Sequence, residues 1–479
     1  MDELRFGTDG WRDRIGERFT TDNVRRAAHA TAGWLRDADG RRVVVAHDTR
    51  FAGPMFARAA AETLAAHGLE VHLADGPLPT PVLSFAVRHL GADAGVMLTA
   101  SHNPPLWNGF KLKGAYGGTA TQEIYAEVAA RTARTEVGAA PPYEPGRHAL
   151  RPLDVREAYF EQLAGLLDLD LLRDLEGTLV HDAMGGTAGG WLSGFARHAG
   201  LTLRVETLRG TPDPMFYGGL PEPVPAQTTA LQARMQRGDA YLGTATDGDG
   251  DRLAGVLPGG RTLNSHEIFA LLLDQRHRAG GRGRVAVTFT VSRLVERLAG
   301  RRGLEVRETP VGFKWLVEEM RAGGVLIAGE ESGGIGVPEH LPERDGIANT
   351  LFLLQACAEA GDAPPGADGG ALGARLDALQ READWRHAYD RVDLPLEGEA
   401  AKARLQAALD ADPDRFAGRE VTSVERLDGV KLNLAGKAWL MFRASGTEPV
   451  LRVYCEAQTH EEVRTLLAEA RTFAEHPPA

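Results

Sequence analysis

Three stretches of the chain share one pattern, in which a short apolar run is followed by a polar loop. They are GVMLTASHNP (95–104), AYLGTATDGDGDR (240–252) and GGVLIAGEESGG (323–334). Short apolar runs between helical patterns predict buried parallel strands in α/β units. In such sheets the ligand-binding loops lie at the carboxyl ends of the strands. We therefore expect these three loops to carry the function of the protein.

The patterns between these strands divide the chain into domains. Apolar residues recur at helical spacing over 52–66 and 313–321, which predicts amphipathic helices. Segments rich in glycine and proline at 138–147 and 361–370 predict connections. Strand-like stretches around a polar loop in 434–457, followed by a helical pattern, predict a smaller C-terminal α+β domain. We expect three α/β domains and this fourth one, over 1–148, 149–258, 259–375 and 376–479.

Composition restricts the class of protein. A chain of 479 residues with 43% hydrophobic and 25% charged residues is typical of a globular protein with several domains. The N-terminus lacks an apolar signal core and no long apolar segment occurs, so we expect a cytoplasmic protein without a membrane span. The net charge of -12 argues against nucleic acid as a partner. It does not exclude an anionic small substrate, because a pocket can be locally basic.

The second of the three loops is acidic. Asp247, Asp249 and Asp251 alternate with glycines and precede Arg252. Three carboxylates this close repel one another unless a cation or a proton compensates. Hard divalent cations take oxygen ligands, and Mg2+ is common where phosphate is also bound. An EF-hand calcium loop is excluded, because its glycine and glutamate positions fall on Arg252 and Pro258. A solvated acidic turn is the alternative for this loop taken alone.

The first and third loops carry hydroxyl groups. Ser101 stands beside His102 where an apolar run ends, which suggests a nucleophile and its base. The pair is not in a G-x-S-x-G elbow, however, and adjacent residues on an extended chain point apart, so an ordinary turn is the alternative. In the third loop, Glu330 and Ser332 could bind neighbouring sugar hydroxyls or could cap a helix.

A fourth polar loop lies in the C-terminal part, from Arg443 through Ser445, Gly446 and Thr447, with Arg452 beyond. Arginines, hydroxyls and backbone N–H groups around a glycine suit a phosphate, although an exposed turn with a salt bridge is the alternative. One chain thus holds a candidate nucleophile, a metal loop, a polyol-binding loop and a phosphate loop. Independent turns rarely produce that set, so the combination indicates phosphoryl transfer on a phosphorylated sugar.

At this point the sequence resembles the α-D-phosphohexomutase family, which includes phosphoglucomutases and phosphomannomutases. The resemblance extends over nearly the whole chain, in the order and spacing of the family. It rests on FGTDGWR (6–12), TASHNP (99–104), NGFK (108–111), DGDGDR (247–252), PVGFK (310–314), GEESGG (329–334) and RASGTEP (443–449). It implies three similar mixed α/β domains and a C-terminal domain that is TATA-box-binding-protein-like, with the four loops around a central cleft.

The resemblance also implies a mechanism. Phosphorylated Ser101 would donate its phosphoryl group to the free hydroxyl of a hexose monophosphate. A hexose 1,6-bisphosphate would form, turn over in the cleft and return its other phosphate to Ser101. Mg2+ would neutralise charge on the transferring group. Its implied ligands are Asp247, Asp249, Asp251 and an oxygen of the phosphoserine.

The remaining site residues are implied in the same way. Lys111 or His102 would accept the proton of the sugar hydroxyl, and Lys111 would need a lowered pKa to do so. Arg12 and Arg252 would order the phosphoserine and the metal loop. The phosphate that does not react would be bound by Arg443, Ser445, Gly446, Thr447 and Arg452. The sugar ring would be bound by Lys314, Glu330 and Ser332. Glucose 1,6-bisphosphate would act as an activator, and the chain would be a monomer or a homodimer.

The sugar is indicated by the third loop. PVGFK with GEESGG resembles phosphoglucomutases, whereas the glucosamine branch usually has glutamine where Glu331 stands. The dual-specificity phosphomannomutase branch usually ends this loop in histidine, and here Gly334 ends it. We therefore expect glucose phosphate as substrate, with mannose phosphate as the alternative and glucosamine phosphate less favoured.

Two other classes of protein are alternatives to a mutase. An alkaline phosphatase also uses a serine phosphoenzyme, but it would need zinc ligands, and the 15 histidines form no ligand cluster in the sequence. A sugar-phosphate-binding relative without activity would be expected to lack Ser101 or one of the three aspartates, and all are present.

Overall fold

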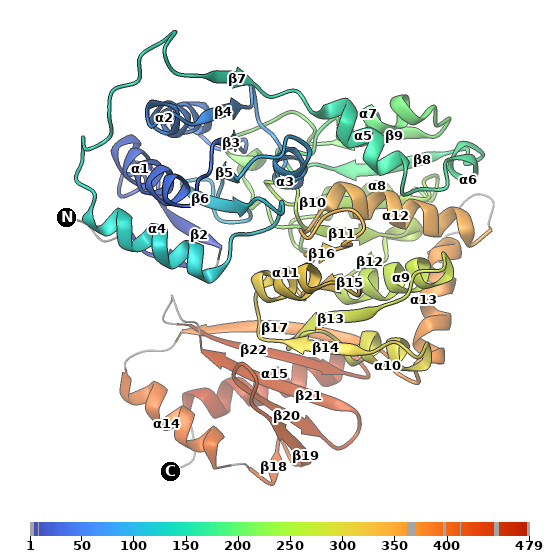
Figure 1. The fold of residues 1–479 in the computed structure, drawn as a ribbon. Helices are drawn as coiled ribbons and strands as arrows, with labels where there is room; N and C mark the ends of the chain where they lie inside the picture. Colours follow the sequence, from blue (N-terminus) through green and yellow to red (C-terminus); the bar gives the residue numbers. More distant parts are fainter. Residues whose placement is uncertain are drawn as a thin grey trace. The chain divides into compact units, whose positions relative to one another are not determined.

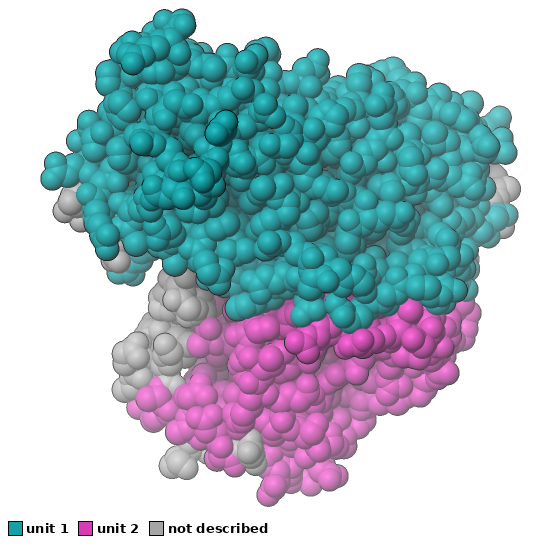
Figure 2. Space-filling model, in the orientation of Figure 1, with its two compact units in different colours: residues 1–284, 312–375 teal, residues 285–311, 376–479 magenta. Residues whose placement is uncertain are grey.

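A computed structural model describes residues 4–7, 9–361, 369–395, 399–411, 413–444 and 450–476. The chain divides into two compact units (Figure 2). Unit 1 consists of residues 1–284 and 312–375, and unit 2 of residues 285–311 and 376–479. Within the described residues, no helix is both long enough and apolar enough to cross a membrane. The four domain boundaries expected from the sequence stay predictions.

Unit 1 begins with a mixed sheet (Figure 1). Within the described residues its strand order is β1-β2-β6-β5-β3-β4-β7. The strands are β1 (Phe6–Gly7), β2 (Gly10–Arg14), β3 (Arg42–His47), β4 (Glu70–Leu73), β5 (Ala94–Leu98), β6 (Trp107–Gly114) and β7 (Leu150–Pro152). Strand β3 is parallel to β4 and β5, whereas β6 is antiparallel to β5. The predicted apolar run at 95–98 is therefore a central strand.

Helices cover this sheet because its strands are apolar on both sides. They are α1 (Thr21–Asp37), α2 (Gly53–Ala66), α3 (Thr80–His89) and α4 (Gln122–Arg134). Val43, Val45 and Val96 join the core formed with α1 and α2. Gly95 lies against α3, where an added Cβ would come 2.8 Å from Leu83. The helix predicted over 52–66 is confirmed as α2.

A second mixed sheet of unit 1 has the order β12-β11-β10-β8-β9. The strands are β8 (Thr178–Asp182), β9 (Arg204–Leu208), β10 (Leu242–Thr246), β11 (Leu253–Val256) and β12 (Thr262–Leu263). The helices of this part are α5 (Arg156–Ala164), α6 (Leu169–Arg173), α7 (Trp191–Ala199) and α8 (Thr229–Met235). Strand β10 is parallel to β8 and antiparallel to β11, so the chain reverses through the acidic loop between β10 and β11.

The last part of unit 1 holds the third loop. Its elements are α9 (Ser265–Arg278), α11 (Phe313–Ala322), β15 (Val325–Gly329), β16 (Ile335–Gly336) and α12 (Gly346–Glu359). The helix predicted over 313–321 is confirmed as α11. Helix α12 is buried along most of its length, because its apolar residues extend all round it. The Asp345 carboxylate caps its N-terminus by accepting hydrogen bonds from two backbone N–H groups.

Unit 2 contains an antiparallel sheet with the order β17-β22-β21-β20-β19-β18. The strands are β17 (Ala388–Pro395), β18 (Arg415–Phe416), β19 (Arg419–Glu425), β20 (Val430–Leu434), β21 (Ala438–Ala444) and β22 (Val450–Ala457). Helices α14 (Glu399–Asp410) and α15 (His460–Glu475) contribute to its core. The unit also includes the parallel strands β13 (Arg284–Thr288) and β14 (Val306–Thr309), with α10 (Arg293–Arg301). Helix α13 (Gly370–Glu382) carries the chain from unit 1 into unit 2.

Candidate active site

Ser101 lies just beyond the carboxyl end of β5 and is buried. Its backbone has a φ of 51°, in the left-handed region that few residues other than glycine adopt. The hydroxyl donates a hydrogen bond of 2.7 Å to Asp247 Oδ2, and Oγ lies 3.4 Å from His102 Nδ1. The strand end therefore directs Ser101 toward the acidic loop, which is distant along the sequence.

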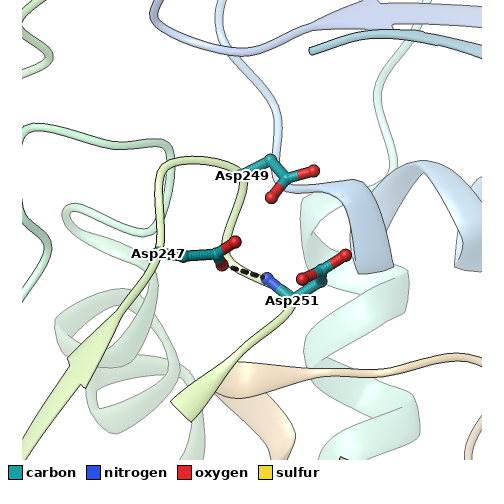
Figure 3. Close-up of side chains that lie close together, drawn as sticks. All are labelled: Asp247, Asp249 and Asp251. Carbon is teal, nitrogen blue, oxygen red and sulfur yellow. Dashed lines mark hydrogen bonds between the residues drawn. The ribbon is translucent and has the colours of Figure 1, made fainter. Parts of the chain in front are cut away.

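The acidic loop follows β10 and brings its three carboxylates together (Figure 3). Asp247, Asp249 and Asp251 are fully buried, and one oxygen from each lies within 4.8 Å of the others. Asp247 Oδ1 accepts hydrogen bonds from the backbone N of Asp251 at 2.9 Å and of Arg252 at 3.0 Å, which fixes the turn. At Gly248 an added Cβ would come 2.8 Å from the Ser101 carbonyl oxygen, so the two loops touch only because this residue is glycine.

These carboxylates fit a divalent cation. Asp249 Oδ1 and Asp251 Oδ1 are buried and accept no hydrogen bond from any residue that the structure describes. Burial raises the pKa of the Asp247 carboxyl, and the neighbouring carboxylates Asp249 and Asp251 raise that pKa further. Oxygen-only ligands with open lone pairs and excess negative charge are what Mg2+ takes in proteins.

Lys111, on β6, lies beside the acidic loop and is fully buried. Its Nζ is 3.1 Å from Asp249 Oδ2, 3.1 Å from Asp9 Oδ2 and 3.8 Å from Asp251 Oδ2. Burial by itself lowers the pKa of the Lys111 amine, but these three carboxylates outweigh it and the pKa is raised. The lowered pKa that a proton-accepting Lys111 would need is therefore not found in this arrangement of charges.

The other predicted catalytic side chains of unit 1 lie around the loop that carries Ser101, residues 99–106 between β5 and β6, which we call the serine loop. Arg12 NH1 donates a hydrogen bond of 2.8 Å to Asn103 Oδ1. Arg252 is buried, with NH1 3.7 Å from Glu222 Oε1. Burial, followed by the positive charges of Arg252, Arg12 and Lys111, holds the pKa of the His102 imidazole well below its usual range. These surroundings favour the neutral form of the His102 imidazole.

The third loop follows β15 and carries two of the predicted sugar-binding residues. Glu330 is buried, and its Oε1 accepts a 2.8 Å hydrogen bond from Ser332 Oγ. The two residues that were predicted to bind neighbouring sugar hydroxyls therefore lie side by side. Lys314 stands at the start of α11, and its Nζ lies 4.7 Å from the centroid of the Trp315 ring.

Two charged residues that contact the site, Arg344 and Asp9, were not predicted from the sequence. Arg344 lies in the loop before α12, and its guanidinium is 2.8 Å from Asp251 Oδ2, 3.2 Å from Glu330 Oε1 and 3.4 Å from Asp9 Oδ2. It thereby links the acidic loop to the third loop. Asp9 also contacts Lys111. Asp9 belongs to the quoted FGTDGWR segment, where only Arg12 was singled out, whereas Arg344 lies outside all four loops.

The predicted phosphate-binding residues belong to unit 2. Arg443 and Arg452 face each other across the β21–β22 pair. Arg443 Nε donates a hydrogen bond of 3.0 Å to Asp428 Oδ2, and Arg452 Nε lies 3.7 Å from Asp393 Oδ2. Ser445, Gly446 and Thr447 lie outside the described residues, so their role stays a prediction.

Comparison with known proteins identifies the family. Models of the four domains of phosphoglucomutase/phosphomannomutase match residues 3–138 (α/β/α domain I), 157–260 (domain II), 264–366 (domain III) and 395–472 (the C-terminal domain). The chain belongs to the phosphoglucomutase/phosphomannomutase family. The fold class expected from the sequence, three mixed α/β domains and a C-terminal domain, is confirmed.

Individual relatives agree with this assignment. A phosphoglucosamine mutase of Salinispora arenicola is 32% identical over 468 residues, covering 96% of this chain and 95% of the relative. A phosphoglucomutase/phosphomannomutase of Thermococcus kodakarensis is 29% identical over 473 residues, covering 96% of each chain. The crystal structure of a Thermus thermophilus protein assigned as a phosphomannomutase is 43% identical, covers 99% of each chain and gives a TM-score of 0.87. The chain is therefore a phosphohexomutase, an enzyme that transfers a phosphoryl group within a sugar phosphate.

Proposed function

We propose that this phosphohexomutase interconverts hexose 1-phosphate and hexose 6-phosphate, with α-D-glucose as the preferred sugar. The reaction runs through a phosphoserine at Ser101 and a hexose 1,6-bisphosphate intermediate. The observation that carries the proposal is the 2.7 Å hydrogen bond from Ser101 Oγ to Asp247 Oδ2, beside two further buried carboxylates. Asp247, Asp249 and Asp251 would hold Mg2+, which when bound neutralises negative charge on the transferring phosphoryl group.

The chain itself supplies the order and the positive charge around Ser101. Arg12 holds Asn103, two residues beyond the serine, and so restrains the serine loop. Lys111 brings a buried positive charge to the same place. Of the two groups predicted to accept the proton of the sugar hydroxyl, His102 remains, because the raised pKa of Lys111 does not suit that role. Arg252 follows the metal loop directly and helps to order it.

Binding of the sugar phosphate is divided between the two other loops in this proposal. Glu330 accepts hydrogen bonds from ring hydroxyls, and its position is supported by the guanidinium of Arg344 3.2 Å away. Ser332 and Lys314 complete the sugar site. The phosphate that does not react would be bound by Arg443, Ser445, Gly446, Thr447 and Arg452. Such a site binds the phosphate group and makes few contacts that depend on the shape of the ring. It can therefore bind either phosphate of the hexose 1,6-bisphosphate.

The choice of sugar rests on the third loop. Glu331 and Gly334 differ from the residues usual in the glucosamine and dual-specificity branches, which favours glucose. Mannose 1-phosphate is the second candidate substrate, because the Thermus relative at 43% identity is assigned as a phosphomannomutase. Relatives near 30% identity carry the name phosphoglucosamine mutase, so that sugar belongs in the same assay.

A comparison of substrates tests the proposal. The 1-phosphates of glucose, mannose, glucosamine and N-acetylglucosamine are supplied one at a time with Mg2+ and a trace of the matching 1,6-bisphosphate. We expect the highest kcat/KM with glucose 1-phosphate and a lower value with mannose 1-phosphate. A preference of about tenfold or more for either amino sugar, equivalent to ~1.4 kcal/mol of transition-state binding, would overturn the glucose assignment.

The phosphoenzyme is tested separately. Intact-protein mass spectrometry should find one phosphate on part of the purified chain, and peptide mapping should place it on Ser101. A dephosphorylated preparation should be inactive until glucose 1,6-bisphosphate is added. Full turnover without the bisphosphate and without a lag would contradict the proposed intermediate.

A further inference from the structure

Arg50, in the loop after β3, is one of the largest fully buried side chains among the described residues. A guanidinium has five N–H donors, and here each of the five makes a hydrogen bond. The acceptors are Asp48 Oδ2 at 3.0 Å and the carbonyl oxygens of Ser101 at 2.7 Å, Asn103 at 2.6 Å, Pro104 at 2.7 Å and Trp107 at 2.9 Å. Four of the five bonds therefore go to backbone carbonyls, three of them in the serine loop and the fourth at Trp107, the first residue of β6.

The same loop is held from its amide side. The backbone N of Ser101 donates a 2.8 Å hydrogen bond to Thr99 Oγ1, and that hydroxyl donates a 2.6 Å bond to Asp48 Oδ2. Asp48 also accepts the backbone N of Arg50 at 2.9 Å. The amide and the carbonyl of Ser101 are thus both tied, through Thr99 and Arg50, to one buried carboxylate at the end of β3.

Ser101 needs such support because of its conformation. With a φ of 51° it is strained, since a side chain in the left-handed region crowds the backbone. A strained residue persists only where its surroundings hold it in place. The carbonyl oxygens of Ser101 and Asn103 are directed at a buried guanidinium, whereas that of Pro104 also accepts a 3.0 Å hydrogen bond from the Trp107 backbone N. The part of the loop at Ser101 and Asn103 therefore depends most on Arg50.

Arg50 also reaches the part of unit 1 that carries the metal loop. Its guanidinium carbon lies 5.0 Å from the centroid of the Phe216 ring. Phe216 in turn packs against Gly248 of the acidic loop, where an added Cβ would come 3.3 Å from that ring. One side chain therefore spans the distance between the serine loop and a residue that contacts the acidic loop.

We propose that Arg50 is the positioning residue for the phosphoryl-carrying serine. By binding four carbonyl oxygens at once it keeps Ser101 left-handed, with Oγ directed at Asp247. This inference rests on the proposed function, in which Ser101 carries the phosphate. Arg50 contacts the loop and none of the residues proposed to bind sugar or the second phosphate. Its loss should therefore lower the rate of phosphoryl transfer and leave binding of the sugar phosphate almost unchanged.

The chain offers a matched control at the end of β8. Asp182 there accepts a hydrogen bond of 3.0 Å from the backbone N of Met184 and one of 2.9 Å from the Nε of Arg209. Arg209 also donates a bond to the Gln227 carbonyl oxygen at 2.9 Å, away from the serine loop. The Asp182–Arg209 pair repeats the Asp48–Arg50 pair in a different sheet. Arg209→Lys therefore makes the same chemical change at a similar ion pair.

The experiment compares Arg50→Lys with Arg209→Lys in the full-length protein. A lysine has three donors, so it leaves at least two of the five acceptors unpaired. We expect kcat to fall about 100-fold in Arg50→Lys, the cost of roughly 1 Å of misplacement, with KM within about threefold of wild type. Hydrogen exchange of the amides over 99–107 should become at least about tenfold faster. Arg209→Lys should leave both quantities within about threefold.

A second pair of variants keeps the test decisive if Arg50→Lys fails to fold. Thr99→Val preserves shape but removes the hydroxyl between Ser101 and Asp48, and Thr99→Ser restores it. In Thr99→Val we expect kcat and amide protection to fall as in Arg50→Lys, but by a smaller factor. In Thr99→Ser we expect both quantities to recover. The inference is overturned if Arg50→Lys keeps the kcat and the amide protection of the wild type. If Arg50→Lys does not fold, the same outcome in Thr99→Val overturns it.

The exchange measurement also separates this inference from the proposed function. If the wild-type enzyme carries no phosphate on Ser101 and turns over no hexose phosphate, the proposed function fails. The exchange rates of 99–107 then still report whether Arg50 holds the loop. Equal exchange in wild type and Arg50→Lys overturns the positioning role whatever reaction the enzyme catalyses.

Discussion

One buried carboxylate of this protein, Glu456, and the buried carboxylates of the acidic loop differ in how many hydrogen-bond donors surround them. Glu456, on β22 of unit 2, is fully buried and is surrounded by hydrogen-bond donors. They are Trp385 Nε1 at 2.9 Å, Trp439 Nε1 at 2.7 Å, the Arg293 backbone N at 3.0 Å, His387 Nδ1 at 2.6 Å and Ser292 Oγ. In the acidic loop of unit 1, Asp249 Oδ1 and Asp251 Oδ1 accept no hydrogen bond from any described residue.

We propose that this difference separates a structural carboxylate from a ligand-binding one. A buried polar atom without a partner costs roughly 1–3 kcal/mol, so a fold that needs only stability supplies donors. Glu456 has these donors and ties the start of α10 to β21 and β22. In the acidic loop Lys111 and Arg344 offset part of the repulsion among the carboxylates, but the Oδ1 atoms of Asp249 and Asp251 stay open, which suits a bound cation. Four predictions test this contrast.

The largest effect is expected from the metal loop. Asp247→Asn keeps the Oδ1 acceptor for the turn but removes a charge from the proposed Mg2+ site. We expect turnover to fall by more than about 10^3-fold, as when a group essential for the transition state is lost. Mg2+ at about 100 times its Kd should stabilise the wild type by ~2.7 kcal/mol in thermal unfolding, and the variant by much less.

Chelation is the control for this change. Chelated wild-type enzyme should lose turnover and regain it with Mg2+, whereas Ca2+ should bind but activate poorly, because it is larger and less demanding in geometry. Full activity after exhaustive chelation would remove the metal from the mechanism and weaken the contrast with Glu456.

The second effect concerns the hydroxyl that contacts Asp247. Ser101→Ala should lower turnover by ~10^3-fold or more, because the nucleophile is gone. Folding stability should change by less than about 1 kcal/mol, since a loop hydroxyl contributes little. Intact-protein mass spectrometry should find no phosphate on the variant. Phosphate that persists in Ser101→Ala would place the nucleophile on another residue.

The third effect should appear in stability and not in catalysis. Glu456→Gln preserves size but replaces one carboxylate oxygen by an amide NH2 group, and each of the two oxygens accepts a tryptophan N–H. We expect the free energy of unfolding to fall by about 3 kcal/mol, measured by urea denaturation. The kcat of the folded variant should stay within about threefold of wild type. A variant as stable as the wild type would show that saturation with donors does not mark a structural carboxylate.

The smallest effect is expected at the sugar loop. Glu330→Gln keeps the shape and loses the charge that would accept hydrogen bonds from sugar hydroxyls. We expect kcat/KM to fall by roughly 10–150-fold, or ~1.5–3 kcal/mol of transition-state binding. The measurement compares glucose 1-phosphate with mannose 1-phosphate. Unchanged efficiency and unchanged preference between them would show that Glu330 does not read the ring.

Local pattern was sufficient to predict the strands and their loops. β5 ends at Leu98, β10 at Thr246 and β15 at Gly329, and the three predicted loops follow these ends. The aspartates could be grouped because they are only two positions apart. An apolar run and its adjacent polar turn are properties of a short segment, which explains why sequence alone could locate them.

Contacts between distant segments could not be predicted in the same way. Arg344 meets Asp251 and Glu330 through packing of separate elements, and no local spacing signals it. The role of Arg50 could not be predicted from the sequence either, because most of its acceptors are backbone carbonyls, which any residue could provide. The charge of Lys111 depends on Asp9 and the acidic loop, which lie far from it along the chain.

The division of the chain into units has a consequence for how the protein is made. Neither unit is continuous: residues 285–311 join 376–479, while 312–375 return to unit 1. During synthesis the segment 285–311 leaves the ribosome long before Glu456, whose carboxylate receives the Arg293 amide. Phe289 of this segment forms a buried cluster with Trp439, Met441 and Tyr454, which are also synthesised later. Until they are made, its apolar side chain is exposed, and exposed apolar surface is prone to misassembly. A nascent chain stopped at residue 375 should therefore fold poorly over 285–311, and pulse proteolysis should find cleavage there that vanishes once β22 is complete.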